Sequence, residues 1–208
     1  MRLRRSRLTG RQSERLLEHF VAGTPARVAA ELVGVNRNTA RLFYHRLREL
    51  IAQNLARGAP RPDAAAIDAL SIEGPGRVPV FALLKDGSWV YVIMLQGNPL
   101  AVPSPASRPA VQPDAVVRAD TAELPRVVDV SRFRHERDRR RTSGGHAPID
   151  NIENFWSQAK RQLRRHNGIP RGHLHLFLKE CEWRFNFGSP NQLKRILKSW
   201  IRAEAVRR

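Results

Sequence analysis

Three carboxylates in the middle of the chain are candidates for metal chemistry. Asp68 lies in an apolar stretch typical of a strand, Asp120 ends a second such stretch, and Glu153 lies at the start of an amphipathic helical segment. Mg²⁺ prefers oxygen ligands, and two such ions about 4 Å apart can activate a water or hydroxyl and stabilise the leaving oxygen of a phosphodiester. Because the chain has 19 acidic residues, many triples are available, and spacing alone does not select this one.

A basic residue lies at helical spacing from the third acid, Glu153. Lys160 follows Glu153 by seven residues in the segment "IENFWSQAKRQL". Seven residues are close to two helical turns, so the two side chains are expected on the same side of a helix. Phe155 and Trp156, which lie between them, are expected to anchor that helix to a sheet.

The charge of the chain is concentrated at its two ends. The formal net charge is +18 and the isoelectric point is near 11.6. Residues 1–57 contain 12 Lys and Arg against 4 Asp and Glu, residues 160–208 contain 13 against 3, and residues 58–159 contain 12 of each. A ribosomal or histone-like protein would be basic throughout. This distribution instead indicates a neutral, catalytic body held on nucleic acid by basic flanks.

Residues 1–57 are predicted to form a helix-turn-helix that binds DNA. Apolar residues recur at helical spacing over residues 13–22. Thr24 is expected to cap a second helix, Gly34 to end it and Asn36 to cap a third. Three helices with a tight turn before the last one form this motif. The last helix would direct four side chains toward base edges and phosphates, namely Arg37, Asn38, Thr39 and Arg41.

Residues 58–208 are predicted to form a second, larger domain, which gives the chain an α+β class. Gly and Pro residues mark residues 53–65 as the linker. Two apolar runs are joined by Asp86-Gly87, which is typical of a hairpin turn. Three long helices are expected at the C-terminal end, over about residues 150–166, 172–187 and 190–206.

Four segments carry the most specific motifs of the chain. They are "VGVNRNTARLFYHRLREL", "GRVPVFALLKDG", "IENFWSQAKRQLRRHNGIP" and "FLKECEWRFN". Together they resemble the transposases of bacterial insertion sequences in the DDE superfamily, specifically its ISXO-like branch, and the resemblance extends to about Trp200. It implies a ribonuclease-H-like mixed sheet flanked by helices, and an enzyme that cuts and joins DNA at element ends.

The resemblance also implies roles for individual residues. Asp68, Asp120 and Glu153 match the three metal-binding acids of the family, and Lys160 matches a basic residue that would position a phosphate. The implied cofactor is a pair of Mg²⁺ ions, with Mn²⁺ as an alternative, which support attack by water and then by a 3′-hydroxyl. The implied partner is DNA, both element ends and target, bound by a homo-oligomer because two ends must be joined. Phosphate contacts are also expected from Arg161, Arg164 and Arg165.

Some alternatives remain open at this stage. Asp129 competes with Asp120 for the second position, and Asn151 is the alternative to Glu153 for the third. The segments "DALSIEG" around Asp68 and "RADTAELP" around Asp120 depart from the family pattern. These departures support a second hypothesis, in which the chain is a catalytically inactive copy that acts only as a DNA-binding protein or repressor.

Two further features bear on the cellular location. Cys181 is the only cysteine, which excludes an intramolecular disulfide framework and a cysteine-based zinc site. The N-terminal segment lacks the apolar core of a signal peptide, and no window approaches the roughly 18 apolar residues of a membrane span. We therefore expect the protein in the bacterial cytoplasm, associated with the nucleoid, with no membrane partner.

Overall fold

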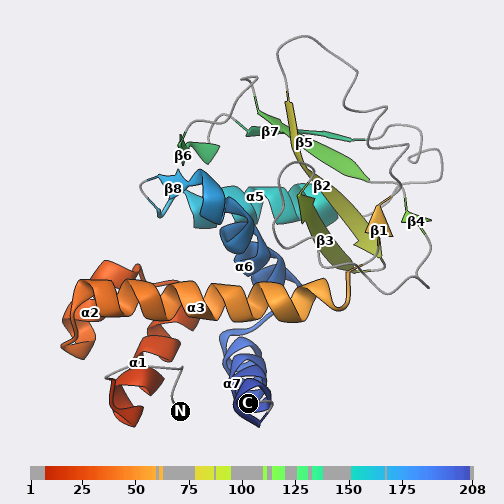
Figure 1. The fold of residues 1–208 in the computed structure, drawn as a ribbon. Helices are drawn as coiled ribbons and strands as arrows, with labels where there is room; N and C mark the ends of the chain where they lie inside the picture. Colours follow the sequence, from red (N-terminus) through yellow and green to blue (C-terminus); the bar gives the residue numbers. More distant parts are fainter. Residues whose placement is uncertain are drawn as a thin grey trace. The chain divides into compact units, whose positions relative to one another are not determined.

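A computed structural model of the chain contains two compact units (Figure 1). One unit is formed by Met1–Asn54 together with Phe187–Arg208, and the other by Leu55–Asn186. The predicted α+β class is confirmed, because the chain combines helices with an antiparallel sheet. The residues that the structure describes are 8–59, 61–62, 78–86, 88–94, 110–111, 114–119, 126–130, 133–137, 151–166 and 168–206.

Four helices build the first unit. They are α1 (Gly10–Val21), α2 (Ala26–Val33), α3 (Arg37–Ala56) and α7 (Pro190–Val206). Helix α1 begins at a capping box, in which Gln12 N–H donates to Thr9 Oγ1 over 3.1 Å and Thr9 N–H donates to Gln12 Oε1 over 3.0 Å. These two bonds satisfy donors that a helix start otherwise leaves unpaired.

A tight turn separates α2 from α3. Gly34 ends α2 with φ of 71°, a left-handed conformation that glycine adopts without the steric penalty of a Cβ atom. Asn36 Oδ1 accepts from Asn38 N–H over 2.8 Å, so the predicted cap of the third helix is confirmed. The prediction for Thr24 is wrong by one position: the N-cap of α2 is Pro25, which has extended ψ and makes no side-chain cap.

The core of this unit is apolar, and α7 adds a charged contact to it. The rings of Phe20 and Tyr44 meet edge to face with centroids 5.0 Å apart. Lys194 of α7 lies 3.1 Å from Glu14 and 2.6 Å from Glu18 of α1. Each such half-exposed pair contributes at most about 1 kcal/mol, so most of the docking energy of α7 comes from its buried residues, Leu193, Leu197 and Ile201.

A four-stranded antiparallel sheet is the centre of the second unit. Its strand order is β3-β2-β5-β7, with β2 at Val78–Asp86, β3 at Trp89–Met94, β5 at Ala115–Ala119 and β7 at Phe133–Arg137. The predicted hairpin is confirmed, because β2 and β3 pair from Phe81 with Met94 to Asp86 with Trp89. Two short pairs complete the described strands: β1 (Arg61–Pro62) with β4 (Ala110–Val111), and β6 (Val127–Val128) with β8 (Ile169–Pro170).

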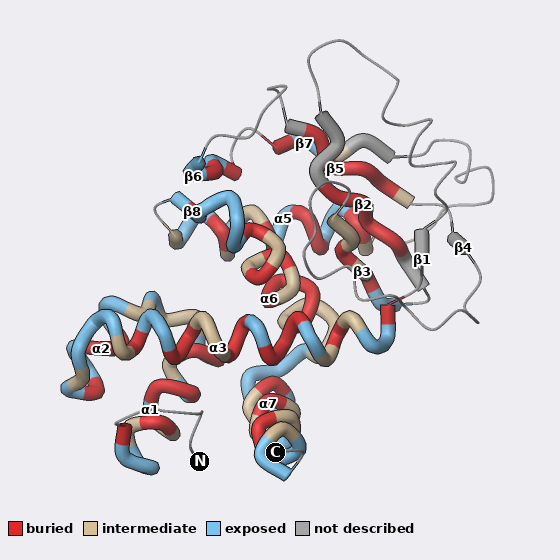
Figure 2. The backbone as a smooth tube through the Cα atoms, in the orientation of Figure 1, coloured by how far each residue is buried: buried red, intermediate tan, exposed pale blue. Residues whose placement is uncertain are grey.

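Helices α5 (Asn151–Leu163) and α6 (Leu174–Phe187) pack against this sheet. Their apolar residues share one core with Phe81, Val92 and Val117, which the strand registers place on one face. A short 3-10 turn, Arg171–His173, precedes α6. Figure 2 shows α6 buried along much of its length, which explains why its sequence lacks a clear polar face.

The outer edge of β3 is closed by side chains of α6. Val90 N–H donates to Asn186 Oδ1 over 3.0 Å, and Asn186 Nδ2 donates back to Val90 O over 2.8 Å. Val92 N–H donates to Glu182 Oε2 over 2.9 Å. An unpaired strand edge is a template for unwanted pairing, so α6 substitutes here for a further strand.

We expect Asn186→Ala to destabilise the protein by about 1–3 kcal/mol, because it leaves the N–H and C=O of Val90 without their partners. Chemical denaturation would measure this loss. Asn154→Ala is the matched control, since Asn154 is exposed and, among the described residues, accepts a bond from the exposed Gln158; its effect should stay within about 0.5 kcal/mol. Equal losses in the two variants would contradict the role assigned to the β3 edge.

Candidate functional site

Helix α5 positions the two side chains that were predicted to act together. Glu153 lies in its first turn and Lys160 in its last, separated by an axial rise of about 10 Å. The acid is exposed and the base is half-buried. An acid near a helix N-terminus and a base near its C-terminus both interact favourably with the helix dipole, so this distribution also stabilises α5.

The buried stripe of α5 sets the direction of both side chains. It consists of Ile152, Phe155, Trp156, Ala159 and Leu163. Phe155 is fully buried and Trp156 is 3% exposed, with the Trp156 ring 5.7 Å from that of Phe81 in the sheet. The expectation that these two aromatic residues anchor the helix to the sheet is therefore confirmed.

Lys160 has an unusual electrostatic environment. Its Nζ lies 5.2 Å from the centroid of the Trp156 ring, within cation–π range. Burial lowers the pKa of Lys160, and repulsion from Arg164 and from Arg134 of β7 lowers the pKa further. Cations that repel one another on a partly buried surface form a favourable site for an anion such as a phosphate.

Asn151, the alternative to Glu153, has a different environment. Its Nδ2 lies 3.5 Å from the carbonyl oxygen of Ser88 in the β2–β3 turn, which is long for a hydrogen bond. The amide is thus directed toward the hairpin turn. Glu153 follows two residues later on the exposed part of the first turn.

A hollow of about 260 Å³ lies beside the C-terminal end of α5. Arg164, His166 and Asp129 contribute its charged and polar groups, and β6 and β8 contribute apolar ones. Gly168, with φ of 83°, lets the backbone pass Val127 there, because a Cβ atom would lie 2.3 Å from Val127 Cγ1. Asp129 and Arg164 thus line the same hollow. Three arginines at this end of α5, Arg161, Arg164 and Arg165, are all exposed.

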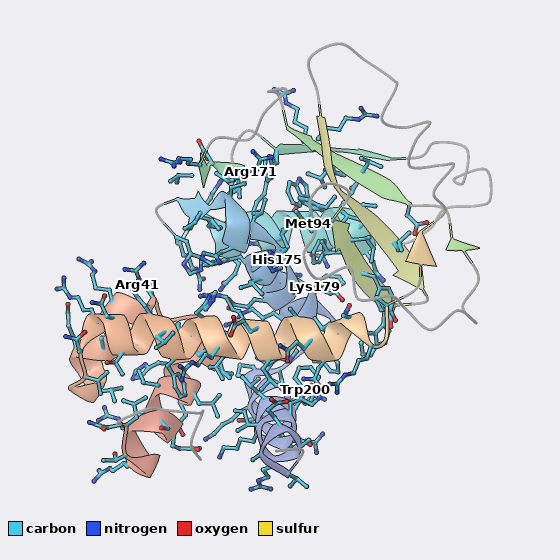
Figure 3. The ribbon with its side chains drawn as sticks, viewed as in Figure 1. Arg41, Met94, Arg171, His175, Lys179 and Trp200 are labelled. Atoms are coloured by element: carbon cyan, nitrogen blue, oxygen red, sulfur yellow. The ribbon has the colours of Figure 1, made fainter. Side chains whose placement is uncertain are left out.

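The first turns of α3 present most of the other predicted contacts. Asn38 and Arg41 are exposed and Thr39 is half-buried; Arg41 is labelled on this helix in Figure 3. Arg37 lies 3.0 Å from Glu31 of α2, and the two side chains are 63% and 60% exposed, respectively. A pair this exposed exchanges readily with another anion.

The two remaining predicted acids, Asp68 and Asp120, lie outside the described residues. Asp120 is the next residue in sequence after β5. Among the residues that the structure describes, no three His, Cys, Asp or Glu side chains form a metal-binding group. The metal-ligand set therefore stays a prediction, with Glu153 as its one described member.

Several residues that support this site were not singled out by the sequence. Glu182 is fully buried in α6, where Lys179 (Figure 3) lies 2.6 Å from it. Burial raises the pKa of Glu182, and the bonds from Lys179 and Val92 N–H oppose that rise. Glu180 of α6 pairs with Arg184 of the same helix at 2.8 Å, and Gln162 of α5 lies 3.5 Å from its Oε1. The one available signal was the alternation of acids with apolar residues in "FLKECEW".

Comparison with known proteins gives two matches. A family model described as the ISXO2-like transposase domain matches residues 57–186. An uncharacterized transposase-like protein of Haemophilus influenzae is 40% identical over 119 residues, which cover 56% of this chain and 97% of that protein. No solved structure matches the chain. The residues matched by the family model nearly coincide with the compact unit Leu55–Asn186.

We expect Arg164→Gln and Arg134→Gln each to raise the pKa of Lys160, because each removes a repelling charge. The pKa would be followed by NMR of ¹³C-methylated lysines, with Lys160→Arg used to assign the signal. Arg165→Gln is the control, since Arg165 is exposed and is not among the groups that lower this pKa. An equal rise in the control would mean that net charge, rather than this cluster, sets the pKa.

Proposed function

The chain belongs to the ISXO2-like transposases, within the DDE superfamily of insertion-sequence transposases, and from this we propose that it binds the ends of an insertion element and catalyses their metal-dependent cleavage and strand transfer. The resemblance noted in the sequence is thereby confirmed at the level of the family. The observation that carries the proposal is the family match over residues 57–186, which includes all four proposed catalytic residues, Asp68, Asp120, Glu153 and Lys160.

The proposed metal ligands are Asp68, Asp120 and Glu153. Three carboxylates are the donor set that suits hard Mg²⁺, with Mn²⁺ as the alternative. We assign Glu153 rather than Asn151 because the Asn151 amide is directed toward Ser88. When bound, two Mg²⁺ ions would supply activation of the attacking oxygen and neutralisation of charge on the leaving oxygen.

The cations of α5 and of the turn that follows it are assigned to the DNA backbone. Lys160 would position a phosphate close to the reacting bond, and the phosphate would relieve its repulsion with Arg164 and Arg134. Arg161 and Arg165 follow on the exposed surface and would contact neighbouring phosphates. In this proposal, water hydrolyses a phosphodiester and frees a 3′-hydroxyl. That hydroxyl then attacks the phosphorus of a target phosphodiester, and the 3′-oxygen of the target strand leaves.

The N-terminal helices are assigned to recognition of the element ends. We propose that α2, the Gly34 turn and α3 form a helix-turn-helix within residues 1–57. We also propose that residues 58–208 form a ribonuclease-H-like catalytic domain with basic C-terminal helices, the last of which, α7, packs in the unit of the N-terminal helices. Arg37, Asn38, Thr39 and Arg41 would then enter the major groove. Two element ends have to be joined, so we propose a homo-oligomer on DNA.

The proposed place of action is the bacterial nucleoid. None of the described helices is both long and apolar enough to span a membrane. A net charge of +18 favours association with a polyanion.

We expect the wild-type protein to cleave duplexes that cover the DNA flanking its coding sequence, in the presence of Mg²⁺ or Mn²⁺. Glu153→Gln should lower the cleavage rate by about a hundredfold or more, because it replaces a charged ligand by a neutral amide of the same size. Glu153 is exposed, so the variant should lose at most about 1 kcal/mol of stability, from the weaker interaction with the helix dipole, and should keep the DNA affinity of the wild type. Gel analysis of end-labelled DNA would measure cleavage.

The variants Asp120→Asn and Asp129→Asn, compared with each other, test which of the two aspartates is the second metal ligand. Loss of cleavage in Asp120→Asn alone would support the proposed set, whereas loss in Asp129→Asn alone would transfer the role to Asp129. If the wild type binds these duplexes but cuts none of them with either metal, the enzyme proposal fails. The protein would then be a DNA-binding protein or repressor.

A further inference from the structure

One apolar side chain interrupts the polar surface of α3. Along α3, all of whose residues the structure describes, Leu42 is the only large apolar side chain that is exposed, at 49%. The other large apolar residues of α3 are buried, among them Phe43, Leu47 and Ile51. Folding of this unit therefore makes little use of the Leu42 side chain.

The neighbours of Leu42 indicate what could contact it. Asn38, one helical turn earlier, and Arg41, the preceding residue, are both exposed. The first acid of α3 is Glu49, two turns beyond Leu42, where it lies 3.3 Å from His45. The surface around Leu42 is thus cationic and amide-bearing, which fits a polyanion better than an apolar protein surface.

The major groove of DNA presents one apolar group, the 5-methyl group of thymine. We propose that Leu42 contacts such a methyl group in the element end and makes that base pair a determinant of sequence specificity. This proposal rests on the proposed binding of DNA by α2 and α3.

The position of Leu42 relative to Asn38 extends the proposal to a short sequence pattern. Four residues of helix advance by about 6 Å, which is close to two base-pair steps of about 3.4 Å. An asparagine side chain can pair with the N6 and N7 atoms of adenine. An adenine contacted by Asn38 and a thymine contacted by Leu42 would therefore lie about two base pairs apart.

The test uses the element-end duplexes in which single thymines are replaced by deoxyuridine, which lacks only the methyl group. At one position the wild type should bind about fourfold more weakly to the uracil duplex, as expected for the loss of one buried methyl group. Leu42→Ala should bind the two duplexes equally, with an affinity close to that of the wild type for the uracil duplex. Fluorescence anisotropy on the full chain would measure all of these affinities.

Leu32→Ala is the control variant, because Leu32 is 54% exposed but lies on α2, whereas all the proposed base contacts come from α3. It should keep the wild-type sensitivity to uracil. Specific binding with no uracil-sensitive position would overturn the assignment of Leu42 and leave the proposed function in place. A changed self-association in Leu42→Ala, with uracil sensitivity retained, would overturn it in favour of a protein contact. A wild type that does not prefer the element ends over unrelated DNA would instead overturn the proposed recognition by α2 and α3.

Discussion

The burial of one side of α5 against the sheet is the constraint on which the proposed catalytic surface depends. Glu153 and Lys160 each follow a buried residue, Ile152 and Ala159, so both lie at the border of the apolar stripe. Rotation of the helix by one residue, about 100°, would bury both side chains. The large apolar surface of Phe155 opposes that rotation. Packing energy far from any substrate thus fixes the direction of the acid and the base.

The parts of the fold that the sequence predicted are those governed by local physics. Helix α5 was predicted from its apolar period, and the β2–β3 hairpin from its Asp86-Gly87 turn. Both signals depend on residues that are close in sequence, and both elements lie close to their predicted positions. The same holds for the pairing of Glu153 with Lys160 on one side of a helix. Thr24 was placed one residue off because Pro25 fixes the φ angle needed at the start of α2 and takes the cap position itself.

What the sequence could not predict depends on residues that are distant along the chain. Glu182 and Asn186 bond to strand residues 90 and 96 positions away, so no local pattern in the sequence indicates their partners. The influence of Arg134 on Lys160 likewise requires knowing that β7 lies near α5. Asp68 and Asp120 stay predictions drawn from the family, because they lie outside the described residues.

The docking of α7 on α1 has a consequence for the order of folding during synthesis. Helix α1 is synthesised before residues 55–186, yet its partner Lys194 is synthesised only after them. Domains generally fold as they emerge, but here the first unit is completed only after the second has been synthesised. Until then α1 lacks its ion pairs with α7, and the first unit lacks the buried side chains of Leu193 and Leu197. A nascent chain would thus acquire its finished N-terminal unit only once the central unit has been translated.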